Sequence, residues 1–157
     1  MARIALTERE VEIIVAAPKT ISKNVEWHSD QNESWLRCEL PVESSLKVNL
    51  KVYINVNAED LSLHSFSLLL NNYYRIRGLD VNGSHRNTHI DSNRWQARTH
   101  KHRWTDVCRQ SFAYTPNETF RNEITENFRL FCEECNIDFR AEIKPLPPKQ
   151  LTFNQME

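Results

Sequence analysis

The chain has 157 residues, of which 39% are hydrophobic and 26% charged, with a formal net charge of −1. This length favours a single domain, and no apolar run approaches the eighteen residues of a membrane span. Glutamates interrupt the N-terminal apolar run that a signal peptide needs, and only two glycines leave no room for a Rossmann fingerprint or a Gly-rich phosphate loop. We therefore expect a soluble, cytoplasmic protein with no membrane partner. The domain is predicted over residues 1–144, with a flexible tail over 145–157.

The four cysteines are predicted to be free thiols, because disulfides are rare in the cytosol. Cys132 and Cys135 form a Cys-x-x-Cys pair, but a zinc knuckle needs a second such pair. The pair also falls at the end of a predicted helix, whereas redox pairs open one. We interpret these cysteines as structural.

The N-terminal third predicts one helix followed by strands. Thr7 and Glu10 make a capping box that begins a helix, which Pro18 ends. Residues 35–40 are predicted to be a strand that Pro41 ends. Residues 46–56 alternate strictly between apolar and polar side chains, which indicates a half-buried antiparallel strand.

Two further strands are predicted over residues 64–70 and 73–81. In the second, Arg75 and Arg77 are expected on the same face. The dipeptide Asn82-Gly83 that follows is a strong turn signal.

The second half is less regular. Residues 84–99 are polar without periodicity and are predicted to be a long loop, a kind of segment that is usually functional or disordered. Residues 100–104 then form a short strand with His100 and His102 on one face. A capping box at Thr115 predicts a long helix to about residue 135, and residues 137–143 predict a last strand. The fold class is therefore α+β, an antiparallel sheet of about five to six strands with two helices packed on it.

Chemistry is concentrated between Arg75 and Arg109. This segment holds four of the six histidines, both glycines, and eight Lys or Arg against three Asp, a charge of +5. Histidine titrates near neutral pH and arginine binds phosphate in a bidentate manner. The composition therefore indicates a polar, cationic site.

The first hypothesis is RNA binding and cleavage without a metal or other cofactor. The predicted catalytic residues are His100 and His102, about 7 Å apart along a strand, with His85 as the third candidate. Asp80 would orient or neutralise a cation of the site. The residues predicted to bind phosphate or to stack on bases are Arg75, Arg77, Arg86, Arg103, Trp95 and Trp104.

Two alternatives stay open. His100 and His102, with Asp80, His85 or His89, have residue types that bind zinc, although the nearby cations would repel a dication. The segment can also be a cationic surface that binds nucleic acid or an acidic protein without catalysis.

One block of residues resembles a known family. Arg77, Asp80, His85, Asn87 and the pair His100-x-His102 resemble a pattern of small, mostly uncharacterised bacterial proteins. A similar arrangement, Arg-x-Asp … His … His-Lys-His, occurs in TumE-like proteins of bacterial toxin–antitoxin systems. The resemblance covers about thirty residues. It implies a cytoplasmic, toxin-like or defence-related protein that acts on RNA, with an antitoxin as protein partner and with Asn87 in an orienting role beside Asp80. The leading prediction is thus a small RNase-like toxin. The alternative is a non-enzymatic module that binds an acidic partner or a nucleic acid, with RNA favoured over DNA.

Overall fold

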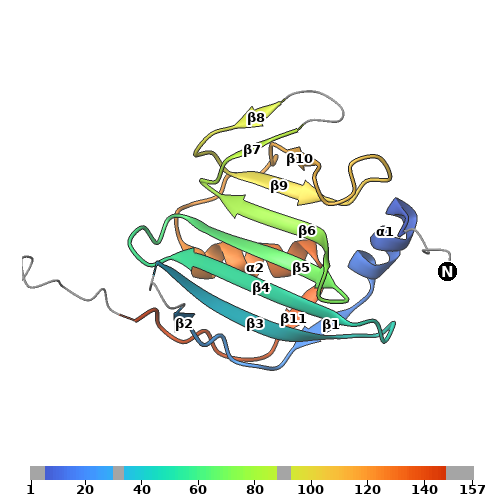
Figure 1. The fold of residues 1–157 in the computed structure, drawn as a ribbon. Coiled ribbons are helices and arrows are strands. Elements are labelled where there is room, and N and C mark those ends of the chain that lie inside the picture. Colours follow the sequence, from blue (N-terminus) through green and yellow to red (C-terminus); the bar gives the residue numbers. More distant parts are fainter. Residues whose placement is uncertain (1–5, 30–33, 88–92, 148–157) are drawn as a thin grey trace, which may run out of the picture.

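The protein is an α+β fold of two helices and one large, mostly antiparallel sheet (Figure 1). The computed structural model describes residues 6–29, 34–87 and 93–147. The helices are α1 (Glu8–Ala16) and α2 (Ile124–Glu134). The strands are β1 (Lys19–Ile21), β2 (His28–Ser29), β3 (Trp35–Ser44), β4 (Leu50–Asn57), β5 (His64–Leu70), β6 (Tyr74–Val81), β7 (His85–Arg86), β8 (Arg94–Trp95), β9 (His100–Arg103), β10 (Ala113–Tyr114) and β11 (Ile137–Phe139).

The main sheet has nine strands in the described part of the chain, in the order β10-β9-β6-β5-β4-β3-β1-β11, with β2 also pairing with β3. The expectation of five to six strands is therefore corrected. The additional strands β1, β2 and β10 have two or three residues each, which is too short for an alternating pattern to be recognised, whereas the predicted last strand is present as β11 over Ile137–Phe139. The one parallel pair joins β1 to β11, so elements near the two ends of the described chain meet at this edge of the sheet.

The central strands follow the predicted alternation. In β4 the side chains of Leu50, Val52, Ile54 and Val56 are buried, and the residues between them are half-buried. The predicted start at Leu46 is wrong, because Lys47 has a φ of 54° and interrupts an extended chain.

The strand β3 continues through Pro41, which was expected to end it. Pro41 lies opposite Lys51 of β4. On its other side β3 pairs with β2 only at residues 36–37 and with β1 only at residues 43–44. Pro41 lies between these two short partners, where its missing N–H interrupts neither pairing.

The core lies between one face of the sheet and the helices. Phe128 and Phe131 of α2 pack on Phe66 of β5, with ring centroids 5.9 and 5.7 Å apart. In Figure 1 α2 lies behind β4 and β5. The predicted N-terminal helix is confirmed with its capping box at Thr7, and its buried residues join the same core cluster.

The second helix is shorter than predicted. Its N-cap is Glu123, whose carboxylate accepts hydrogen bonds from the backbone N–H groups of Thr125 and Glu126. The capping box at Thr115 does not begin a helix. Thr115 Oγ1 instead accepts a hydrogen bond from Trp95 Nε1, and Glu118 pairs with Lys101.

Most of the expected tail lies outside the described residues, as residues 148–157 are not described. Neither helix of the described chain is long and apolar enough to cross a membrane. All four cysteines are buried and free.

Candidate functional site: a histidine–aspartate cluster

The site begins with the pairing of two neighbouring strands. Asp80 of β6 lies opposite His100 of β9, and Gly78 lies opposite His102. Residues directly opposite each other share a face, so Asp80 and both histidines lie on one side of the sheet. Lys101, between the histidines, points the other way and pairs with Glu134 of α2, 2.8 Å away. The predicted His-x-His face therefore lies on the side of the sheet away from α2.

One oxygen of the Asp80 carboxylate lies close to both histidines. Asp80 Oδ2 lies 2.9 Å from Nε2 of His102 and 3.1 Å from Nε2 of His100. The other oxygen, Oδ1, accepts a 2.7 Å hydrogen bond from Nη2 of Arg75. Asp80 thus links three cationic or titratable groups.

A β-bulge brings Arg75 to this face. The pairing of β5 with β6 shifts between Leu68 and Leu69, which lie opposite Arg77 and Arg75, so that Ile76 is the extra residue. Arg75 and Arg77 therefore lie on opposite faces, and the expectation that they share one is wrong. A strict period of two cannot reveal a bulge.

Gly78 gives the Arg75 guanidinium room to cross the strand. A Cβ atom at position 78 would lie 2.3 Å from Cζ of Arg75, which no real contact allows. At Gly83, the other glycine of the chain, an added Cβ would lie 3.2 Å from Cβ of Asp80 and 3.4 Å from Cε1 of His100. Both glycines therefore border the cluster. Glycine is rare in this sequence, and the two glycines could have indicated the position of the site.

His85 completes the cluster from the predicted loop. Part of this loop forms a two-stranded ribbon, β7 with β8, which was not expected because each strand has two residues. The His85 ring lies 4.7 Å from that of His102 and 5.8 Å from that of His100, measured between centroids. Trp95 of the ribbon lies 5.6 Å from the His100 ring. In Figure 1 the ribbon lies at the β9–β10 end of the sheet.

Asn87 attaches the ribbon to β10. Its amide Nδ2 donates to the backbone carbonyl of Ala113 over 2.9 Å, and its Oδ1 accepts from the Ala113 N–H over 3.0 Å. His85 Nε2 also donates to the carbonyl of Ser111. Asn87 is buried, so its role in this structure is to hold the ribbon in place rather than to contact a ligand directly.

The cluster is enclosed on one side and open on the other. His100 is fully buried and His102 nearly so, whereas the side chains of Arg75 and Asp80 are 20% and 21% exposed. His85 is half-buried. A ligand can therefore approach the cluster along Arg75, Asp80 and His85.

Three neighbouring side chains keep the Asp80 carboxylate charged. Burial alone would raise the pKa of the Asp80 carboxyl, but His100, His102 and the Arg75 guanidinium together hold it well below its usual range. Burial lowers the pKa of His102, and the hydrogen bond to Asp80 offsets this only in part. His102 is therefore a neutral imidazole at pH 7 in this structure.

The other predicted phosphate-binding residues lie elsewhere. Arg77 and Arg103 lie opposite each other on the other face, where they pair with Glu12 and Glu8 of α1. Trp104 is buried against Tyr74, and its Nε1 donates to the carbonyl of Leu6.

The remaining predicted residues are divided between the ribbon and the undescribed segment. Arg86 is exposed on the ribbon, and Trp95, which lies opposite His85, is buried. His89, a metal candidate in the sequence, lies outside the described residues.

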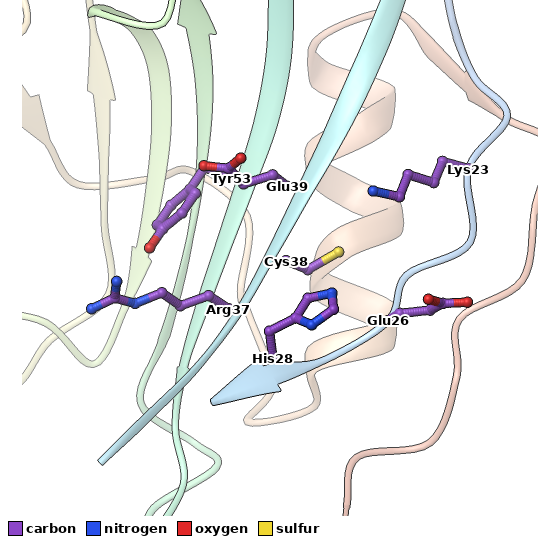
Figure 2. Close-up of a pocket in the computed structure, with 7 residues that line it drawn as sticks. All are labelled: Lys23, Glu26, His28, Arg37, Cys38, Glu39 and Tyr53. Atoms are coloured by element: carbon purple, nitrogen blue, oxygen red, sulfur yellow. The ribbon is translucent and has the colours of Figure 1, made fainter. Parts of the chain in front are cut away.

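A separate pocket of about 320 Å³ lies beside β3 (Figure 2). Its lining includes Lys23 and Arg37 as well as Glu26 and Glu39, so charges of both signs face it. Burial raises the pKa of the adjoining Cys38 thiol, which keeps it protonated. The described lining of this pocket holds one histidine, His28, and so has no pair of histidines beside one carboxylate as the cluster does.

The fold and the cluster define an α+β protein with a partly buried His₃–Asp–Arg site on the sheet face opposite α2. The model of a family of unknown function, DUF6978, matches residues 6–137, and the chain belongs to this family. The match spans the cluster, α1 and α2. No curated protein and no solved structure matches the chain.

Proposed function

We propose that the protein acts on RNA at the cluster of Asp80, His85, His102 and Arg75. The observation that carries this proposal is the arrangement around His102. Its Nε2–H donates to Asp80, while its buried Nδ1 has no hydrogen-bond partner among the described residues. A histidine oriented by a carboxylate and with a free ring nitrogen is the arrangement that a general base requires.

The neighbours of His102 supply the other groups that phosphodiester cleavage needs. A base takes the proton of the ribose 2′-hydroxyl, an acid protonates the leaving oxygen, and a cation stabilises the charge on phosphorus. His102 and His85, whose rings are 4.7 Å apart, take the two proton-transfer roles. Arg75, on the open side, binds the phosphate.

His100 takes a different role from the one expected from the sequence. Its Nδ1 donates to the Arg98 carbonyl and its Nε2 faces Asp80, so neither ring nitrogen is free to exchange a proton with a substrate. We place it as a positioning residue that holds Asp80.

The resemblance to TumE-like proteins agrees with this assignment, because Asp80, His85 and His102 are among the residues that carry it. Under this proposal the protein is a toxin-like ribonuclease of the cytoplasm, and its protein partner is an antitoxin.

A binding module without catalysis is the second candidate, and one observation favours it. Arg86 and Arg94 lie directly opposite each other on the ribbon, and both are exposed. Like charges in a cross-strand pair are unfavourable, and an anion bound between them relieves the repulsion. The ribbon is therefore suited to a phosphate backbone or an acidic protein surface.

Incubation of the purified chain with total RNA, with and without EDTA, tests the first candidate. We expect cleavage by the natural chain and at least a hundredfold slower cleavage by His102→Gln, since general acid–base catalysis contributes about 10²–10⁴-fold. Gly78→Ala should also slow it, because the added Cβ displaces the Arg75 guanidinium from Asp80.

His28→Gln is the matched control, because His28 is an exposed histidine on β2. Intact RNA in both tubes at high protein concentration would exclude catalysis and leave the binding module. The EDTA tube separates metal-free proton transfer, which the sequence predicts, from metal-assisted chemistry.

A further inference from the structure

The hydrogen bonds of His100 fix which of its nitrogens carries a proton. Nδ1 lies 3.0 Å from the backbone carbonyl of Arg98, and a carbonyl only accepts, so Nδ1 is the protonated nitrogen. In the neutral ring Nε2 therefore presents a lone pair. That lone pair lies 3.1 Å from the negatively charged Oδ2 of Asp80.

Two lone pairs at this distance repel each other unless a second proton on the ring or a metal ion lies between them. Nε2 of His100 is fully buried and has no hydrogen-bond partner among the described residues, although Oδ2 of Asp80 is close. An unpaired polar atom in the interior destabilises the folded state. A bound cation removes this cost, because it accepts both lone pairs at once.

The third ligand atom is Nε2 of His102, 2.9 Å from the same carboxylate oxygen. The three candidate ligand atoms lie within 4.8 Å of one another. Two ligand atoms that each lie about 2.1 Å from one metal ion are about 3.0–3.4 Å apart in octahedral or tetrahedral sites. Small rotations of the imidazole rings therefore bring these atoms to the spacing of a metal site.

We propose that Asp80, His100 and His102 bind one divalent transition-metal ion, of which zinc is the first candidate. Two imidazoles and one carboxylate form the ligand set of catalytic zinc sites and of facial iron sites, both of which leave coordination positions open. This inference goes beyond the proposed function, since metal binding is measured without RNA.

The surroundings of the three ligands suit this role. The hydrogen bond from His100 Nδ1 to the Arg98 carbonyl is the outer contact that orients a metal-bound imidazole. His102 would bind through Nε2 with its proton on Nδ1, so the metal-bound state and the general-base role of His102 exclude each other. Arg75 donates to Oδ1 of Asp80 over 2.7 Å and to Oδ2 over 3.4 Å, and the longer of these two hydrogen bonds is the one that the ion would replace.

Arg75 also indicates what the open positions accept. The ion and the guanidinium together outweigh the single charge of Asp80, so the loaded site is cationic and attracts an anion. A phosphate group approaching along the exposed side of Arg75 meets both positive charges. Repulsion between the metal ion and the Arg75 guanidinium counts against a metal at this site. That repulsion is relieved when an anionic ligand is bound.

The cysteine pair is the competing ligand set, and its chemistry differs. Burial raises the pKa of the Cys132 thiol to about 12, and Cys135 is raised further. Thiols that remain protonated are poor ligands, since the thiolate is the form that binds metal. The two sets can be separated by spectroscopy, because cobalt bound to thiolate absorbs strongly in the near ultraviolet.

The test uses the full chain without an affinity tag, stripped with EDTA and dialysed. Zn²⁺ is titrated into it by calorimetry, and Co²⁺ is added to a second sample for visible spectra. We expect one ion per chain with micromolar or tighter affinity. The cobalt sample should show the bands of nitrogen and oxygen ligands without a thiolate band.

The variants Asp80→Asn, His100→Gln and His102→Gln should each weaken zinc binding by more than about a hundredfold, as loss of an outer contact alone costs about 10–100-fold. His64→Gln is the matched control. His64 is also a buried histidine of the sheet, but both of its nitrogens have partners outside the cluster. The control should bind zinc as the natural chain does.

Failure to bind Zn²⁺ or Co²⁺ at 100 μM would overturn the inference, and so would a thiolate spectrum or unchanged binding in all three variants. Should a variant fail to fold by circular dichroism, the cobalt spectrum of the natural chain decides alone. If the chain binds metal but leaves RNA intact, the metal site stands and the proposed function is excluded. If the chain binds no metal but cleaves RNA in EDTA, the proposed function stands and the metal site is excluded.

Discussion

Single residues of one type have different roles here because their hydrogen-bond partners differ. His64 and His100 are both fully buried histidines at the start of a strand. His64 donates from Nδ1 to the Leu61 carbonyl and accepts at Nε2 from Asn127, so a neutral ring satisfies both nitrogens. In His100 the second nitrogen, Nε2, faces the Asp80 carboxylate instead. His64 is therefore explained by folding alone, whereas His100 requires a cation or a second proton.

This difference leads to a prediction about pH. Burial lowers the pKa of His64 below the usual 6.5. As the pH falls below about 6.5, the unfolded chain takes up this proton before the folded chain does, so the free energy of unfolding decreases. The contribution is at most about 1.4 kcal/mol for each pH unit in that window. His64→Gln should therefore lose less stability between pH 7.5 and 5.0 than the natural chain, as measured by urea denaturation.

His28→Gln is the control for the removal of a histidine, because His28 is exposed. Its stability should change with pH as that of the natural chain does. An identical pH dependence for His64→Gln and the natural chain would contradict the prediction.

At the scale of elements, contacts with the rest of the fold decide where a helix begins. Residues 115–118 have the capping pattern, but Thr115 bonds to Trp95 and Glu118 pairs with Lys101. These partners come from β8 and β9, and they hold the segment outside the helix. The helix begins after Glu123, where a carboxylate accepts two orphan N–H groups.

Glu123→Ala should therefore lower the free energy of unfolding by about 0.5–2 kcal/mol, the usual cost of losing an N-cap. Urea denaturation measures it. Glu59→Ala, which removes an exposed glutamate from a turn, should change stability by less than about 0.5 kcal/mol. Equal effects of the two changes would show that the cap does not stabilise α2.

At the scale of the whole molecule, charge is unevenly distributed. The chain carries −1 overall, but residues 75–109 carry +5. Folding divides this positive charge between two faces. Arg77, Lys101 and Arg103 are neutralised by glutamates of the helices and of the segment before α2, while Arg86 and Arg94 are exposed on the ribbon. The surface available to an anionic polymer is therefore smaller than the sequence indicates.

The double variant Arg86→Gln, Arg94→Gln should bind RNA more weakly than the natural chain at low salt. Each phosphate contact that is lost should reduce the slope of log affinity against log salt by about one, so the slope should fall by about two. Filter binding or fluorescence anisotropy at several salt concentrations measures both quantities.

Arg129→Gln with Arg140→Gln is the matched control, because it removes two exposed arginines far from the ribbon in the fold. It should leave the salt slope unchanged. An equal loss in both double variants would indicate binding through general charge rather than through the ribbon.

The sequence by itself determined the features that depend on neighbouring residues. The helix at Thr7, the strand over residues 64–70 and the shared face of His100 and His102 follow from capping and from a period of two, both of which are local. It also located the cluster in the correct segment, since its charge and its histidines are matters of composition.

Only the tertiary structure decided which of these residues meet. His85 and His102 are seventeen positions apart, and the bulge at Ile76 separates Arg75 from Arg77 although the alternating pattern joins them. The short strands β1, β7, β8 and β10 form where a neighbouring strand offers a partner, and their own sequences carry too little pattern to predict them. The contacts of His100 with Arg98 and Asp80 depend on strand pairing as well. The residue types therefore indicated the chemistry of the site, whereas side-chain packing and strand register set its geometry.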